Sequence, residues 1–74
     1  MKVLLFGSLA EKAGTDLVEL QADTTHALKH VLAQHIPGLH DLSFSIAVDR
    51  VIVHDDIQLQ GNEEIAVLPP FAGG

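Results

Sequence analysis

Five short stretches of the chain carry the apolar patterns that are typical of β-strands. They are residues 2–7, 16–21, 44–49, 51–53 and 63–68. The second and third stretches alternate between apolar and polar positions, which predicts strands with one buried face. The first and last are apolar at consecutive positions, as is typical of strands that are covered on both faces. We therefore expect the first and last strands to pair in parallel in the centre of one sheet.

A helix is predicted between the second and third strands, where apolar residues recur at helical spacing. The predicted apolar stripe consists of Ala27, Leu28, Val31, Leu32 and Ile36. Asp23 or Thr24 is expected to cap the start of this helix, and Pro37 with Gly38 to end it. A single helix with one apolar stripe can cover one face of one sheet.

A shorter helical signal lies between the first two strands. Ser8 and Glu11 have the spacing of a capping box, and Gly14 has the place of a C-terminal stop. The order strand, short helix, strand, helix and three strands predicts an α+β protein with its main helix on one face of a mixed sheet. This is the layout of the β-grasp, or ubiquitin-like, fold. We expect one domain, residues 1–68, followed by an extended tail, residues 69–74.

The sheet face turned away from the helix is predicted to be apolar near the tail. If Val3 and Leu5 face the helix, neighbouring positions of the same strand face away from it. On this basis we expect Phe6, Ile52 and Leu68 to form an exposed apolar patch, a feature that marks interaction sites. The alternative is a satellite cluster covered by the short helix or by a loop.

The tail begins directly after the last strand. It consists of Pro69, Pro70, Phe71, Ala72, Gly73 and Gly74. The two prolines stop the strand and favour an extended chain, and the two glycines make a thin terminus. Fully extended, six residues reach about 20 Å, enough to enter the active site of another protein. The alternative is a frayed end without a function.

Composition narrows the choice of function and location. The net charge of −6, with four Lys and Arg residues, argues against binding to nucleic acid. Without cysteine the chain has no disulfide and no thiolate ligand or nucleophile. Its apolar runs are far shorter than the ~20 residues of a membrane helix. We expect a cytoplasmic domain that does not contact a membrane.

The histidines and the acidic pairs of the sequence do not predict a metal site or a catalytic site. His26 and His30 are four residues apart on the main helix, but no third ligand has metal-site spacing, so we interpret them as solvated. The acidic pairs 55–56 and 63–64 are interpreted as solvated surface that faces a basic partner. No glycine-rich phosphate loop is present, so ATP would have to be bound by another protein.

The sequence resembles the MoaD family, the small sulfur-carrying subunits of molybdopterin synthase. The resemblance covers essentially the whole chain and is carried by residues 2–14, 47–49 and 61–74, above all by the Pro-Pro-x-x-Gly-Gly ending. It implies a non-catalytic carrier that binds no cofactor itself.

The resemblance also implies a set of partners. The functional terminus is Gly73-Gly74. An adenylating enzyme related to ubiquitin activators uses ATP and Mg²⁺ to activate the carboxylate of Gly74, and a sulfur donor then converts this carboxylate to a thiocarboxylate. The loaded tail then enters the large synthase subunit and gives sulfur to precursor Z. Partner contacts are expected from Phe6, Ile52 and Leu68, and from residues 69–72.

Three other functions remain open at this point. The chain is alternatively a sulfur carrier for thiamin or another pathway, although the predicted short helix argues against the thiamin carriers. It is also compatible with a ubiquitin-like modifier that is conjugated to lysines through Gly74, or with an interaction module whose tail has no chemistry.

Overall fold

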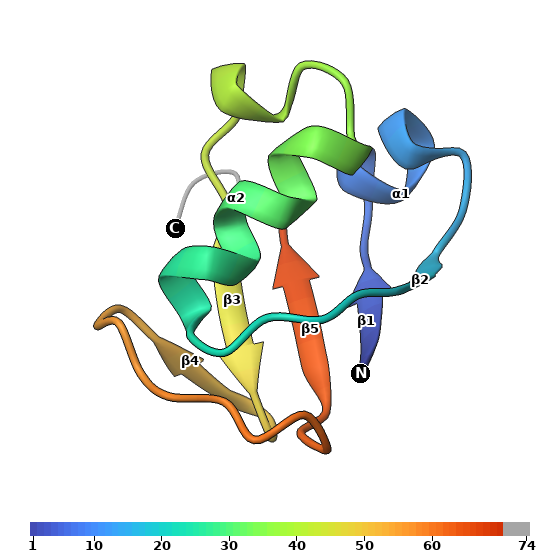
Figure 1. Ribbon diagram of the computed structural model, residues 1–74. Coiled ribbons are helices and arrows are strands. Elements are labelled where there is room, and N and C mark those ends of the chain that lie inside the picture. The colour runs from blue at the N-terminus through green and yellow to red at the C-terminus, as the bar shows by residue number, and fades with distance from the viewer. Residues whose placement is uncertain (71–74) are drawn as a thin grey trace.

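A computed structural model describes residues 1–70 as a five-stranded sheet with one long helix across it (Figure 1). The elements in chain order are β1 (Lys2–Leu5), α1 (Ser8–Ala13), β2 (Leu17–Glu19), α2 (Thr25–His35), the 3₁₀ helix η1 (Leu39–Asp41), β3 (Ser45–Val48), β4 (Val51–Val53) and β5 (Ile65–Leu68). The predicted order of strands and helices is confirmed, and η1 is an addition to it. None of the helices in this part of the chain has the length and apolarity that crossing a bilayer requires.

The sheet has the strand order β2-β1-β5-β3-β4. β5 lies in its centre, parallel to β1 and antiparallel to β3, as the continuous apolar runs predicted. β2 pairs with β1, and β4 with β3, both antiparallel. With α2 on one face, this is the β-grasp arrangement (Figure 1).

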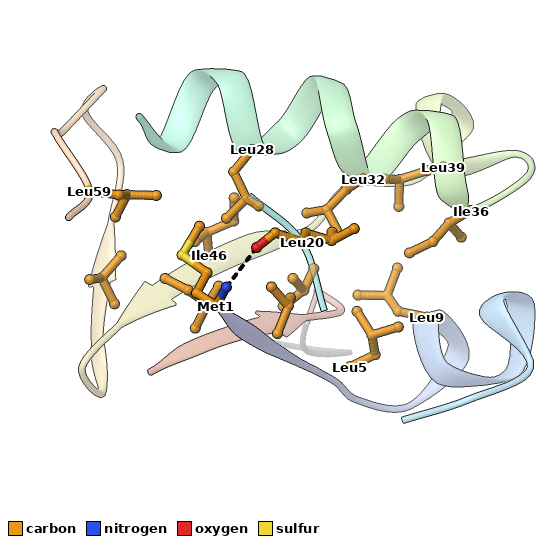
Figure 2. Packing of buried hydrophobic residues seen from close by; sticks show 14 residues of the cluster. Met1, Leu5, Leu9, Leu20, Leu28, Leu32, Ile36, Leu39, Ile46 and Leu59 are labelled. Atoms are coloured by element: carbon orange, nitrogen blue, oxygen red, sulfur yellow. Dashed lines mark hydrogen bonds between the residues drawn. The ribbon is translucent and has the colours of Figure 1, made fainter. Parts of the chain in front are cut away.

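The core fills the space between α2 and the sheet (Figure 2). The central strands turn Val3, Leu5, Ile65 and Val67 toward the helix, and each is at most 2% exposed. From the helix, Leu28, Leu32 and Ile36 of the predicted stripe point back at the sheet. The predicted inward alternation of the central strands is thereby confirmed.

The start of α2 is held by side chains from two directions. Thr24 occupies the N-cap position, and its hydroxyl accepts a hydrogen bond from the Ala27 N–H at 3.0 Å. Thr25 is buried, and its hydroxyl accepts a hydrogen bond from the Ile57 N–H at 3.0 Å. Since unpaired buried polar groups are costly, Thr25 ties α2 to the segment that leads toward β5.

The predicted capping box at α1 is wrong. Gly7, and not Ser8, is the N-cap residue, and no side chain caps this end. Gly7 has a φ of 57° and a ψ of −132°, a conformation that glycine adopts more readily than other residues. The predicted stop is confirmed, because Gly14 is left-handed and its N–H bonds the Ala10 and Glu11 carbonyls.

Several strands are shorter than predicted. β5 begins at Ile65 and not at residue 63, because the side chain of Glu63 folds back onto the preceding loop. β3 ends at Val48 because Asp49 and Arg50, with φ of 50° and 70°, form the tight turn into β4. Hydrogen bonds between Asp49 and Glu64 fasten this turn beside the start of β5.

Candidate partner-binding face and tail root

The outer face of the sheet, turned away from α2, carries one apolar residue from every strand in a continuous row. In the register of the sheet, Leu17 pairs with Leu4, Leu4 with Ala66, Ala66 with Ala47, and Ala47 with Ile52. Leu17 and Ile52 are both 43% exposed and Leu4 is 36% exposed. Between them Ala66 is half-buried and Ala47 is only 5% exposed. The row is therefore open to solvent at Leu17 and Leu4 and again at Ile52, but not in its middle.

Two of the three predicted patch residues lie together on this face. The N–H of Phe6 donates to the Val67 carbonyl at 3.2 Å, which places Phe6 beside Leu68 in the parallel register. Phe6 is 45% exposed and Leu68 is half-buried. Ile52 lies two strands away from Leu68 and pairs with Ala47, which is 5% exposed, so it does not lie beside Phe6 and Leu68 as predicted.

The short helix does not cover Phe6, contrary to the alternative of a satellite cluster. Leu9 of α1 points into the core and is 1% exposed, which directs the helix to the end of the core (Figure 2). The exposed fraction of Phe6 shows that the aromatic ring stays open to solvent. This end of the outer face is thus available for contact with another molecule.

The root of the tail lies at the same end of the sheet as Phe6. β5 runs directly into Pro69, which is half-buried, and Pro70, which is exposed. A Cβ placed on Gly7 would come within 3.1 Å of Pro69 Cγ, so the proline ring packs against the glycine. The remaining predicted tail residues, Phe71, Ala72, Gly73 and Gly74, lie outside the described residues.

A hollow of about 580 Å³ lies at the opposite end of the outer face. Leu4 and Leu17 are among the residues that line it, with Glu19 of β2 and the loop that precedes β5 around them. Leu17 was not predicted to belong to an apolar surface. Its place beside Leu4 depends on the strand register, which the alternation of residues 16–21 alone does not provide.

The acidic pair 63–64 lies at the surface, as predicted, but both carboxylates also make structural contacts. The Glu63 carboxylate accepts hydrogen bonds from the Gln60 N–H at 2.7 Å and the Gly61 N–H at 2.9 Å. These bonds stabilise the charged form and hold the pKa of Glu63 below its usual 4.5. Glu64 pairs with Arg50 at 3.2 Å. Both carboxylates therefore organise the loop next to β5.

In the other acidic pair, Asp56 also has a structural contact. Its carboxylate accepts a hydrogen bond from the His26 N–H at 2.9 Å, at the start of α2. An acceptor at this position satisfies a free N–H of the first helical turn and favours the helix dipole. The interpretation of Asp56 as solvated surface is therefore incomplete.

The rings of His26 and His30 lie 5.0 Å apart between centroids on the exposed side of α2. Within residues 1–70, no group of three or more His, Cys, Asp or Glu side chains is arranged to hold a metal ion.

Comparison with known proteins decides the family. A model of the ThiS family matches residues 3–74, nearly the whole chain including the tail. The chain belongs to the ThiS family. The chain is similar to the molybdopterin synthase sulfur carrier subunit of Escherichia coli (strain K12), at 38% identity over 80 residues. That match covers 100% of this chain and 99% of the relative.

Two further relatives carry the same name. The proteins from Dictyostelium discoideum and Caenorhabditis briggsae are 30% and 32% identical to this chain. These matches cover 99% and 100% of this chain, and 94% and 96% of the relatives. The resemblance to the MoaD type within the ThiS family is therefore confirmed.

Solved structures confirm the ubiquitin-like β-grasp fold. The solution structure of small archaeal modifier protein 1 from Methanosarcina acetivorans has a TM-score of 0.85 and 25% identity. The match covers 99% of this chain and 94% of the archaeal chain. The crystal structure of the Haloferax volcanii protein has a TM-score of 0.77 and 23% identity, and matches 100% and 98% of the two chains.

Proposed function

We propose that this ThiS-family chain is the sulfur carrier subunit of a molybdopterin synthase. The observation that carries the proposal is the end-to-end match to relatives with that name, at up to 38% identity. The family match extends through residue 74, so it includes the Gly-Gly terminus and not only the fold. We further propose that the chain acts in the cytoplasm.

The chemistry that we propose takes place at the carboxylate of Gly74. Its ionised oxygen attacks the α-phosphate of ATP on an activating enzyme that supplies Mg²⁺, and pyrophosphate leaves. The resulting acyl-adenylate has the leaving group that a free carboxylate lacks. A sulfur donor then displaces AMP and leaves a thiocarboxylate, whose sulfur is transferred to precursor Z on the large subunit.

The arrangement of residues 1–70 supports a carrier whose folded domain positions the tail and does not itself take part in the chemical steps. β5 is paired on both sides, and Pro69 packs against Gly7 where the strand ends. The outer face beside this root presents Phe6, which is 45% exposed. We propose that the large subunit grips this face while Gly73 and Gly74 enter its active site. Glycines suit a narrow channel because they carry no Cβ.

Intact-mass spectrometry tests the proposed loading directly. The chain is incubated with the activating enzyme, ATP, Mg²⁺ and a sulfur donor. A gain of about 16 Da is expected as sulfur replaces oxygen. Gly74→Ala is expected to fold normally and to gain no mass. Normal loading of Gly74→Ala, or cofactor synthesis by a chain that lacks both glycines, would contradict the proposal.

A second candidate function is that of a protein modifier conjugated through Gly74. It is favoured by the structural match to small archaeal modifier protein 1, with a TM-score of 0.85. An isopeptide-linked adduct after incubation with activating enzyme, ATP and acceptor proteins would support it. If the same mixture, supplied also with a sulfur donor, yields thiocarboxylate without adducts, the carrier function stands alone.

A further inference from the structure

A hollow of about 240 Å³ lies between α2 and the segment that leads into β3. It is lined by His26, Lys29, His30, Ala33, Leu39, Leu42 and Phe44. The helix supplies a lysine and two imidazoles, and the segment 39–44 supplies apolar side chains. One wall can therefore donate hydrogen bonds to an anion, and the other is apolar. Because small-molecule sites usually measure about 300–1,000 Å³, the hollow suits one aromatic side chain and a small anion better than a cofactor.

The hollow is a basic spot on an acidic chain. Lys29 is one of four Lys and Arg residues in a chain with a net charge of −6. No carboxylate lines the hollow, and within residues 1–70 none forms an ion pair with Lys29. Asp55 and Asp56 line a second, smaller hollow with Lys29, but the Asp56 carboxylate accepts its hydrogen bond from the His26 N–H at 2.9 Å. The Lys29 ammonium can therefore attract an anion from elsewhere.

The tail leaves the sheet next to this hollow. Leu68 at the end of β5 pairs with Ser45 at the start of β3. The same register, continued by one residue, sets Pro69 beside Phe44, with the two strands about 4.8 Å apart. Residues 71–74 span up to about 14 Å when extended, which is several times this spacing. The end of the chain is therefore long enough to reach the hollow.

We propose that the end of the chain docks reversibly in this hollow. Phe71 packs on Leu42 and Phe44, which are both half-buried. The carboxylate of Gly74, which is charged at neutral pH, pairs with Lys29. The aromatic ring and the carboxylate thus meet the apolar wall and the basic wall. Because the tail is tethered, its effective concentration is on the order of millimolar, so a weak contact is enough to populate the docked form.

Docking holds the terminus back from other proteins until a partner displaces it. This consequence rests on the proposed function, in which another enzyme activates Gly74. Only the undocked fraction of the chain is open to activation, so docking lowers the rate of loading in proportion. The hollow is on the α2 side of the sheet, whereas Phe6 lies on the outer face. A partner can therefore bind the outer face first and then draw the tail out.

NMR of the full chain tests the docking without any partner. Nuclear Overhauser contacts are expected between the Phe71 ring and the side chains of Leu42 and Phe44. Lys29→Gln removes the charge and is expected to weaken these contacts at least about twofold. Lys2→Gln is the matched control, because Lys2 is exposed at the start of β1 and does not line the hollow. It is expected to leave the contacts unchanged.

Three NMR results would overturn the docking. The first is the absence of these contacts in the unaltered chain. The second is an equal loss of the contacts in Lys29→Gln and Lys2→Gln. The third is a set of contacts that strengthens with protein concentration, since the hollow would then take the tail of a second copy and not that of its own chain.

The rate of loading tests the consequence separately. Lys29→Gln is expected to be loaded by the activating enzyme about two- to fivefold faster than the unaltered chain, because less of it is docked. Lys2→Gln is expected to keep the unaltered rate. An unchanged rate for Lys29→Gln, despite weakened NMR contacts, would refute the protective role. If no chain is loaded while the contacts persist, the proposed function fails and the docking stands.

Discussion

The ring of Pro69 lies against the α-carbon of Gly7, where an added Cβ would be 3.1 Å from Pro69 Cγ. Gly7 joins β1 to α1, and Pro69 joins β5 to the tail. Two connections far apart in sequence are therefore packed together at one end of the sheet. This contact constrains the direction in which the tail leaves the domain.

Gly7→Ala is expected to lower the free energy of unfolding by about 1–3 kcal/mol. Gly7 has a φ of 57°, which disfavours any residue with a side chain. In addition, the Cβ of alanine would lie too close to the Pro69 ring. Urea denaturation monitored by circular dichroism measures the effect. Gly14→Ala is a useful comparison, because Gly14 also has a positive φ, of 75°, but nothing within 4 Å of its added Cβ. It is expected to cost about 1 kcal/mol.

A double-mutant cycle separates the contact from the backbone strain. In a chain that carries Pro69→Ala, the strain of Gly7→Ala persists while the close approach to Pro69 Cγ is removed. The effect of Gly7→Ala should then be smaller. Strictly additive effects would show that the Pro69 contact has no role in the destabilisation.

Thr25→Val is expected to destabilise the fold by about 1–3 kcal/mol. Valine fits the space but leaves the Ile57 N–H without the hydroxyl that accepts its hydrogen bond at 3.0 Å. Thermal unfolding measures the loss. The control is Thr15→Val, because the Thr15 hydroxyl is exposed and its contacts with Leu17 are local. Equal effects of the two changes would contradict the assigned role of Thr25.

Glu63 should make a pH-dependent contribution to stability. Hydrogen bonds from Gln60 and Gly61 lower the pKa of Glu63 in the folded state below the usual 4.5. The contribution is therefore complete above about pH 4.5 and is lost as pH falls through the lowered folded-state pKa. Urea midpoints of the unaltered chain and of Glu63→Gln should differ at pH 7 and converge in acid. A constant offset for Glu63→Gln between pH 7 and pH 3 would show that the loop amides do not stabilise the charged carboxylate.

Phe6→Glu is expected to weaken binding to the large synthase subunit at least about tenfold while leaving stability nearly unchanged. Phe6 is 45% exposed beside the tail root, so a charge is tolerated in the free domain but would be desolvated in the proposed complex. Calorimetry with the purified large subunit measures the change. Val51→Glu is the control, because Val51 is 63% exposed and has the opposite parity to Ile52 of the outer face. Equal losses for both variants would argue against Phe6 as a specific contact.

The sequence was sufficient to predict the features that depend on periodicity. The grouping of Val3, Leu5, Ile65 and Val67 on one face follows from parity, because neighbouring strand residues face opposite sides, although which face meets the helix was assumed. The parallel pairing of β1 with β5 follows from two continuous apolar runs. Local chemistry limited the helix cap to Asp23 or Thr24, and Thr24 is the residue that caps the helix.

Features that depend on register and on contacts between distant residues were not predictable in the same way. Leu17 belongs to the apolar row only because β2 pairs with β1 in the register that sets it opposite Leu4. Ser8 and Glu11 match a capping box by spacing, yet the sharp turn after β1 places Gly7 at the cap. Glu63 is polar and close to a turn, but its hydrogen bonds appear only once the loop is folded.

The central place of β5 also bears on how the domain withstands a pull on its end. In the proposed function, a partner that draws the tail into a channel would apply tension along β5. Ladders to β1 and β3 lie alongside that strand and resist sliding together, so the load is shared over many hydrogen bonds and is not concentrated on one. A strand at the sheet edge would peel away under the same tension. The topology thus suits the proposed carrier function, in which partners would bind and release the terminus in turn.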